Sequence, residues 1–184
     1  VDEIHQLGIN EIKRIRAEMD LIFSNPPLSY PATETLLQLY NQVMVDGGLR
    51  EATQVVATYE ALIAKAESKL GEAFNETPLT DLVVIGGAYG GWYIPGLADG
   101  TRPAEFHVQS DQPIPWYGMT TLSHHEAIPG HHYQISLATE AGLPSFRVSG
   151  FTAYVEGWAL YAERLAKELG WLDNDIYSDL GRLH

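Results

Sequence analysis

The chain of 184 residues contains no cysteine. This absence excludes disulfide bonds, thiolate metal ligands and a cysteine nucleophile, and it removes the usual compositional indicator of the redox compartment. Histidine and carboxylate side chains are then the only strong metal ligands that the chain can offer. Any metal site must therefore be built from these two residue types.

Basic residues are also scarce, because 11 lysines and arginines stand against 24 acidic residues and give a formal net charge of −13. Such a charge repels a phosphate backbone, so we exclude nucleic-acid binding. The sequence has no apolar run of about 18 residues and no signal-peptide pattern at its start, so we expect no membrane span in this chain. The sequence begins at Val1 without an initiator methionine, which predicts a processed product or a fragment.

Hydrophobic residues make up 45% of the chain, which is enough for one domain with a substantial core that needs no metal in order to fold. We predict a single domain over 1–184. Within it we expect a helical scaffold over 1–76, a small sheet with a glycine-rich loop over 77–118, and metal-binding helices over 119–184. The predicted fold class is α+β and mainly α-helical.

Helical periodicity is clearest in the first third of the chain. The first helix carries apolar residues near one face, namely Ile4, Leu7, Ile12, Ile15, Met19 and Ile22, and ends at "SNPPLSYP". A second helix is expected over 32–45 with Thr33 available as its N-cap, and "DGG" ends it. A third is expected over 49–74.

Two strands are predicted in the middle of the chain. The first contains the β-branched run 83–85, and the second is "AEFHVQS" at 104–110. A glycine- and aromatic-rich loop, "GGAYGGWYIPGLADGTRP", separates them. Helix is expected again from Met119 onward, with breaks at "AGLPS" and Gly170.

The most informative stretch is "HHEAIPGHH" at 124–132, which holds four of the seven histidines. His125-Glu126 opens the zincin pattern HExxH, in which two histidines one helical turn apart bind zinc and the glutamate acts as a base. The second ligand of that pattern would stand at position 129, which is Pro129 here. The usual spacing is therefore broken.

On a regular helix His131 would lie about 9 Å along the axis from His125 and roughly 120° around it, and His132 about 10.5 Å away. Neither position suits one small ion. Pro129, however, lacks a backbone donor and crowds the carbonyl of residue 125, a defect of about 3 kcal/mol in a helix interior. We therefore expect a kink or bulge that brings His131, with His132 as the alternative, beside His125. Metal binding of about 10 kcal/mol would outweigh the cost.

A third protein ligand is needed, and catalytic zinc sites leave the fourth position open. The best candidate is Glu156 in "YVEGWALYAE", 25 residues after His131 on a helix that can pack back against the first. Glu163 lies seven residues further, on nearly the same face. It is a candidate for the carboxylate that orients a ligating histidine.

The motifs "HEAIPGHHYQ" and "EGWALYAE" together resemble the bacterial family called domain of unknown function 885, which is placed with the gluzincin metallopeptidases. The segments "GWYIPGLADGTRPAEFHV" and "VDEIHQLGINEI" resemble other parts of that family, so the resemblance covers nearly the whole chain. It implies a zincin-like fold, a zinc cofactor and Glu156 as third ligand. Members of the family are much longer, so we expect further sequence to contribute to the substrate site.

The function implied is zinc-assisted hydrolysis of a peptide or related amide, with Glu126 as the general base that later protonates the leaving amine. Tyr154 and Tyr161, which flank Glu156, are candidate donors to the developing oxyanion. The resemblance also implies that the predicted strand at 104–110 pairs with an extended peptide substrate. It implies a bacterial protein and leaves the compartment open, with an extracytoplasmic location as one alternative.

Other interpretations remain open. The histidine cluster can be a hydrogen-bonded part of the core, and the domain can be a non-catalytic metal- or peptide-binding module. A carboxylate-bridged di-metal oxidase is the third alternative, but that class uses paired ExxH units, which the chain lacks. His124 is expected to be structural, and the remaining histidines, His5, His107 and His184, are expected to be incidental.

Overall fold

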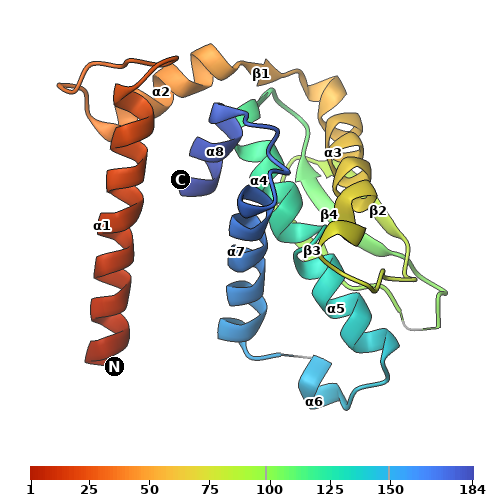
Figure 1. The fold of residues 1–184 in the computed structure, drawn as a ribbon. Coiled ribbons are helices and arrows are strands. Elements are labelled where there is room, and N and C mark those ends of the chain that lie inside the picture. Colours follow the sequence, from red (N-terminus) through yellow and green to blue (C-terminus); the bar gives the residue numbers. More distant parts are fainter. Residues whose placement is uncertain (98, 149) are drawn as a thin grey trace.

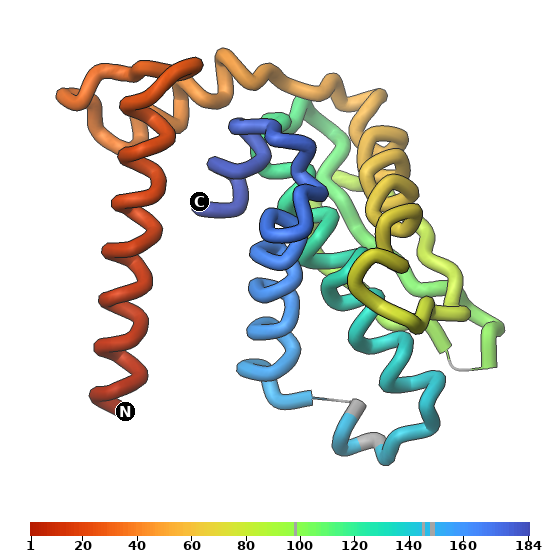
Figure 2. Tube along the Cα trace, in the orientation of Figure 1, coloured from red at the N-terminus to blue at the C-terminus, as the bar shows by residue number. Residues whose placement is uncertain are grey.

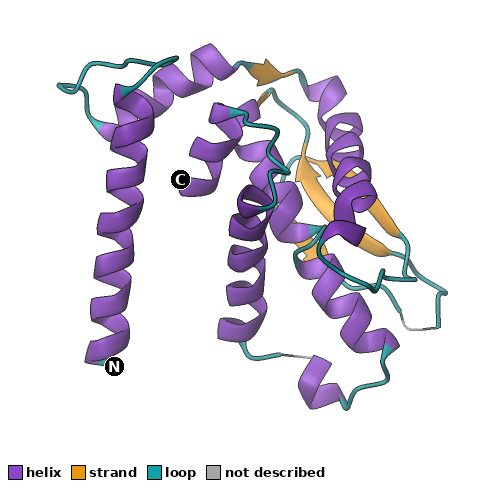
Figure 3. Cartoon of the chain, in the orientation of Figure 1, coloured by secondary structure: helices purple, strands orange, loops and turns teal. Residues whose placement is uncertain are grey.

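The computed structural model describes residues 1–97, 99–148 and 150–184, and it is mainly α-helical with a small β-sheet, as predicted (Figures 1 and 3). The α-helices are α1 Asp2–Ser24, α2 Leu36–Gly47, α3 Val55–Lys69, α4 Trp116–Glu126, α5 His131–Glu140, α6 Ser145–Val148, α7 Thr152–Glu168 and α8 Ile176–Leu183. Short 3-10 helices are η1 Ala52–Gln54 and η2 Leu70–Glu72. The strands are β1 Leu49–Arg50, β2 Leu82–Gly87, β3 Trp92–Ile94, β4 Ala104–Gln109 and β5 Ile114–Pro115.

Helix α1 has the predicted apolar face, but only its C-terminal half packs against the rest of the molecule. Met19 and Phe23 are 3% exposed and lie with residues of α2 and α8 in a small core, whereas Ile4 is 76% exposed and Leu7 is 69% exposed. The N-terminal half stands apart from α7 in the trace (Figure 2). Periodicity therefore predicted the helix correctly, while burial of its face ends near the middle.

The second and third segments differ from the predictions in detail. Helix α2 begins later than expected, with Thr35 and not Thr33 as its cap, because the Thr35 side chain and Gln38 form a reciprocal capping box. The segment predicted as one helix over 49–74 begins instead with β1, which pairs with β5, and with η1. Gly48 precedes this short strand with φ of 79°, a conformation that separates α2 from it.

The main sheet has the order β2-β4-β3, with β2 parallel and β3 antiparallel to β4. Along β4 the side chains alternate, so that Phe106 and Val108 are fully buried while Glu105 and His107 lie on the other face. Both predicted strands are present. β4 is the central strand, however, so the expectation that it pairs with a substrate peptide is wrong: both of its edges are already occupied.

Strand β3 lies within the segment predicted as a loop, and it forms one edge of the sheet. The chain reaches it through Gly90, where a Cβ atom would overlap the backbone of Val108 and Gln109. Only glycine permits this close approach, which is why the loop can turn tightly back onto β4. The opposite side of β3 has no partner strand among the described residues.

The larger core lies between α3, the sheet and helices α4, α5 and α7. Helix α3 contributes a stripe at helical spacing, which consists of the buried residues Val55, Tyr59, Ile63 and Ala66. Helix α4 contacts α3, α7 and α8, and α5 packs on α7, so the two helices of the histidine cluster run through the middle of the molecule (Figure 1). In the described part of the chain, no helix combines the length and apolarity needed to cross a membrane.

Candidate metal centre

The histidine cluster spans a break between two helices. Helix α4 ends at Glu126, a cis Ile128–Pro129 peptide follows, and α5 begins at His131. At Gly130 a Cβ atom would overlap the carbonyl oxygens of His124 and His125, so the chain passes directly against the last turn of α4. This close approach requires glycine and starts the new helix beside the end of the old one.

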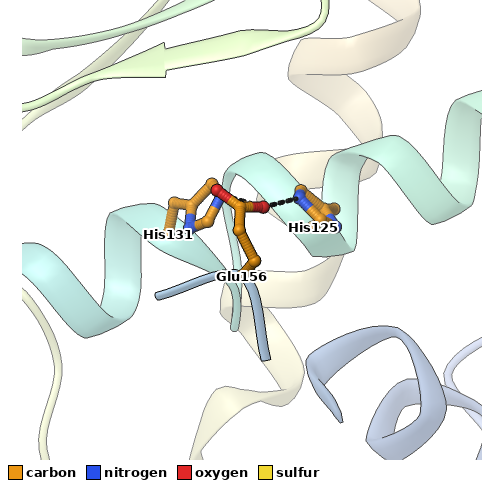
Figure 4. A group of neighbouring side chains, drawn as sticks. All are labelled: His125, His131 and Glu156. Carbon is orange, nitrogen blue, oxygen red and sulfur yellow. Dashed lines mark ion pairs between the residues drawn. The ribbon is translucent and has the colours of Figure 1, made fainter. Parts of the chain in front are cut away.

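Three side chains converge at this break (Figure 4). One ligand atom each from His125, His131 and Glu156 lie within 4.8 Å of one another. The Glu156 Oε2 atom is 3.4 Å from His125 Nε2 and 3.7 Å from His131 Nε2. Zinc bonds of about 2.0–2.1 Å in a tetrahedron separate the ligand atoms by about 3.3 Å. The two separations from Glu156 are close to this value, so small side-chain movements would let the three groups hold a single ion of this size.

His125 is oriented by a second carboxylate. Its Nδ1 atom lies 2.7 Å from Glu163 Oε1 on α7, so Nδ1–H donates to the carboxylate and Nε2 points toward Glu156. Burial disfavours the charged imidazolium, but the hydrogen bond and charge of Glu163 outweigh it and raise the pKa of His125. The arrangement matches that of metal-ligating histidines, whose second nitrogen usually donates to a carboxylate.

His131 lacks the hydrogen bonds that a buried imidazole normally makes. Its Nδ1 atom is buried and has no partner among the described residues, and its Nε2 atom is beyond hydrogen-bond distance from Glu156. Burial and the neighbouring charge of His125 lower the pKa of His131 and favour the neutral ring. A neutral imidazole with a free nitrogen facing a carboxylate suits a bound cation.

Glu126 lies in the same pocket and is 5% exposed. Burial raises the pKa of its carboxyl to about 7. The negative charges of Glu156 and Glu163 also raise this pKa, whereas the charge of His125 lowers it. A carboxyl group with this pKa exchanges a proton readily near neutral pH. Glu126 thus shares the pocket lining with His125, His131 and Glu156.

The sequence neighbours of these two histidines, His124 and His132, make their hydrogen bonds outside the cluster. His124 is buried against the core, where its Nδ1 atom donates to the carbonyl of Ile128 at 2.8 Å. His132 has its Nδ1 atom 3.3 Å from the hydroxyl of Tyr93 and 3.3 Å from that of Ser136. Of the two histidines considered for the second ligand position, the structure brings His131 to the cluster and leaves His132 outside it.

The pocket in front of the cluster has a volume of about 400 Å³ and lies between β3 and the helices. Its walls consist of Gly91, Trp92, Tyr93, Pro95, His125, Glu126, His131, Ile135, Val155 and Glu156. Ile135 and Val155 are pocket residues that were not predicted. Helical spacing was the available signal, because Ile135 is one turn after His131 and Val155 precedes Glu156 directly.

The two tyrosines predicted as oxyanion donors do not line this pocket. Tyr154 is 60% exposed and Tyr161 is 47% exposed on α7, and their catalytic role stays a prediction. Tyr93 from β3 lines the pocket instead. The side chain of Arg102 donates to the carbonyl of Pro95 and is not a pocket residue.

The histidines expected to be incidental lie away from the described cluster. His107 is on the opposite face of β4, where it pairs with Glu105 at 2.7 Å and stacks on Trp92. His184 packs against Tyr40 beside the smaller core. Neither takes part in the arrangement around Glu156.

The solved structures that are similar to the chain include two bacterial proteins. A protein from Colwellia psychrerythraea assigned as a lipoprotein is 32% identical, with a TM-score of 0.87 over 98% of the chain. A protein of unknown function from Shewanella oneidensis, also assigned as a lipoprotein, is 19% identical, with a TM-score of 0.77 over 99% of the chain, and shows the fold alone. The chain covers 33% and 37% of these two proteins, about a third of their length.

No protein with a curated description is significantly similar to the chain. The match to a protein family, in contrast, extends over residues 1–184. The chain therefore belongs to the family described as bacterial protein of unknown function (DUF885).

Proposed function

We propose that the protein is a zinc-dependent hydrolase that cleaves peptide or related amide bonds. The observation that carries this proposal is the convergence of His125, His131 and Glu156, with Glu126 in the same pocket. Three protein ligands and an open fourth side are typical of catalytic zinc sites, whereas structural sites are closed by four protein ligands.

His125, His131 and Glu156 would hold the ion, which when bound supplies a Lewis acid that polarises a carbonyl and activates water. Glu126 takes the proton from the attacking water, because its raised pKa lets it hold that proton near neutral pH. The same carboxyl then gives the proton to the leaving nitrogen. Glu163 keeps His125 in the tautomer whose Nε2 faces the site.

An extended peptide suits the shape of the pocket. One wall is β3, whose outer edge has no partner strand among the described residues and could pair with a peptide backbone. The other walls include Ile135 and Val155, which offer apolar surface to a substrate side chain. The edge strand, in place of the central β4, is the part of the sheet that can perform this role.

The di-metal oxidase alternative receives no support from the carboxylates. That alternative would draw its ligands from the four helical glutamates Glu126, Glu140, Glu156 and Glu163. Glu140, however, accepts hydrogen bonds from the backbone of Leu79 and Thr80 and from the Thr80 hydroxyl. The Glu140 carboxylate is therefore engaged in hydrogen bonds with another segment and does not face the cluster. A single-ion site remains the better explanation.

The test is the metal content and peptidase activity of the purified protein beside two variants. We expect about one zinc per chain in wild type, loss of zinc in Glu156→Gln, and retention of zinc in Glu126→Gln with hydrolysis lowered by about 10²- to 10⁴-fold. Glu168→Gln, the same change on the exposed side of α7, is the matched control.

Unchanged hydrolysis in Glu126→Gln would exclude Glu126 as the base. Stoichiometric zinc with no hydrolysis of a broad peptide mixture would favour the metal- or peptide-binding module. Two irons per chain would favour the oxidase.

We also propose an extracytoplasmic location. The support is the 32% identity to the Colwellia psychrerythraea protein that is assigned as a lipoprotein. Fractionation of the native host with an antibody against the chain tests this location, and recovery in the cytosolic fraction would contradict it.

A further inference from the structure

Helix α5 carries a histidine and further contacting side chains on each of two faces, and the proposed hydrolase uses only one of these faces. His131 and Ile135, one turn apart, face the pocket. His132, Ser136 and Glu140 follow at the same spacing of four residues on another face, where they contact the sheet and the segment before it. The fourth histidine of the cluster thus has a role that metal binding does not explain.

His132 connects two segments that are distant in the sequence. Its side chain and Thr80 line the same cavity beside the sheet. The Nδ1 atom of its ring lies 3.3 Å from the hydroxyl of Tyr93 on β3, within hydrogen-bond distance and 39 residues away in the sequence.

The Thr80 end of this connection is itself fixed. Glu140 accepts from the Thr80 backbone at 2.9 Å, from its hydroxyl at 2.7 Å and from the Leu79 backbone at 3.0 Å. Burial disfavours the charged carboxylate, but these hydrogen bonds outweigh it and lower the pKa of Glu140. Since α5 carries both Glu140 and His132, one rigid helix holds the segment before β2 and, through Tyr93, the strand β3.

Tyr93 joins this network to the pocket. Its ring lines the pocket wall, while its hydroxyl reaches behind that wall to His132 and, at 3.4 Å, to Ser136. The helix that begins with His131 therefore also sets the distance of the edge strand from the metal cluster. The contacts of the Tyr93 hydroxyl with α5 are shielded from water, because His132 is 2% exposed and Ser136 is 4% exposed.

We propose that His132 is a positioning residue, which holds Tyr93 and thereby fixes edge strand β3 at the place where a substrate backbone binds. This inference rests on the proposed function for the identity of the substrate. It gives the two histidines of "GHH" separate tasks on one helix: His131 faces the ion, and His132 sets the position of the opposite wall. Loss of His132 should weaken substrate binding and leave metal binding intact.

The experiment compares Tyr93→Phe, His132→Ala and His132→Gln in the zinc-loaded protein. Loss of one hydrogen bond of about 0.5–1.5 kcal/mol corresponds to a rise in KM of about 2- to 10-fold for a peptide substrate, with kcat and zinc content unchanged. His132→Gln keeps an acceptor and a donor in one side chain, so we expect it to restore KM toward wild type. Tyr89→Phe is the matched control, because Tyr89 is 81% exposed in the adjoining loop.

Hydrogen exchange of the backbone amides of Trp92–Ile94 supplies a readout that does not need activity. We expect faster exchange in Tyr93→Phe and His132→Ala than in wild type and Tyr89→Phe. Unchanged KM and unchanged exchange in both variants would overturn the proposal, as would loss of zinc in His132→Ala. If wild type binds zinc but cleaves no peptide, the proposed function fails and substrate positioning with it, whatever the exchange data show.

Discussion

The two faces of the α4–α5 unit use the same residue types in different ways. On the pocket face, His125 and His131 have nitrogens that point toward the Glu156 carboxylate. On the packed faces, His124 and His132 are bonded to backbone carbonyls or hydroxyls and are almost fully buried. His124 is adjacent in the sequence to His125, and His132 is adjacent to His131. A step of about 100° around the helix separates the two members of each adjacent pair.

The protonation and the hydrogen bonds of each histidine follow from the groups that surround it. The packed rings are neutral, because burial lowers the pKa of both His124 and His132. His125 has a raised pKa, since the glutamates around it outweigh burial. Four carboxyl or imidazole groups facing one small volume are costly unless a cation or protons compensate them. The pocket face therefore suits a bound cation, whereas the histidines of the packed faces are satisfied by the fold itself.

The largest effect that separates these faces is expected for His131→Ala. Removal of this ring should weaken zinc binding by at least about 100-fold, since a site with two protein ligands is left. His124→Ala, on the packed side, should keep the metal. Zinc affinity measured by competition with a chelator checks the pair, and equal loss of zinc in both variants would remove the distinction between the faces.

Gly130→Ala should affect both faces at once. The added Cβ atom would overlap the His124 and His125 carbonyls, so the break between α4 and α5 must open, at a cost of about 3 kcal/mol or more. Gly118→Ala in α4, where a Cβ atom meets nothing within 4 Å, should instead stabilise the protein by about 0.5–1 kcal/mol. Urea unfolding of the metal-free proteins measures both. Similar stability of the two variants would contradict the role given to Gly130.

A smaller effect is expected for Glu163→Gln. The amide still occupies the position next to His125 Nδ1 but lacks the negative charge, so zinc affinity should fall by about 10- to 100-fold. Glu168→Gln on the same helix should leave it unchanged. A chelator titration measures the zinc affinity of each variant. A zinc affinity of Glu163→Gln equal to that of wild type would show that Glu163 only packs against His125.

The smallest effect is expected on the packed side, for the unfolding of His124→Ala. The variant leaves the buried Ile128 carbonyl without its donor, so the free energy of unfolding of the metal-free protein should fall by roughly 1–2 kcal/mol. Urea unfolding in the presence of a chelator measures this loss. Unaltered stability would mean that the bond between His124 and Ile128 contributes nothing.

Local features of the sequence predicted much of the fold. The helices over α1, α2 and α7 follow from apolar spacing, and β2 and β4 follow from β-branched residues and alternation. The two-residue β1 and the three-residue β3 were not predicted, because such short strands depend on their partners and not on a pattern of their own. The position of β4 at the centre of the sheet depends equally on pairing.

The site was predictable where its chemistry is carried by a motif. His125, Glu126, Glu156 and Glu163 stand out by residue type and spacing, and the structure brings them together. Tyr93 carries a weaker signal, because an aromatic residue in a glycine-rich loop can equally belong to a turn or to a pocket wall. Its place in the pocket results from the pairing of β3 with β4.

The break in the helix at Pro129 and Gly130 could be predicted without coordinates, because the missing donor and the missing side chain are properties of those residues alone. The sequence left open which of His131 and His132 would meet His125. That choice depends on tertiary packing, because the position of α5 between α7 and the sheet sets its rotation. The same packing brings Glu156 to His125 across 31 residues of sequence, a distance that no local preference can specify.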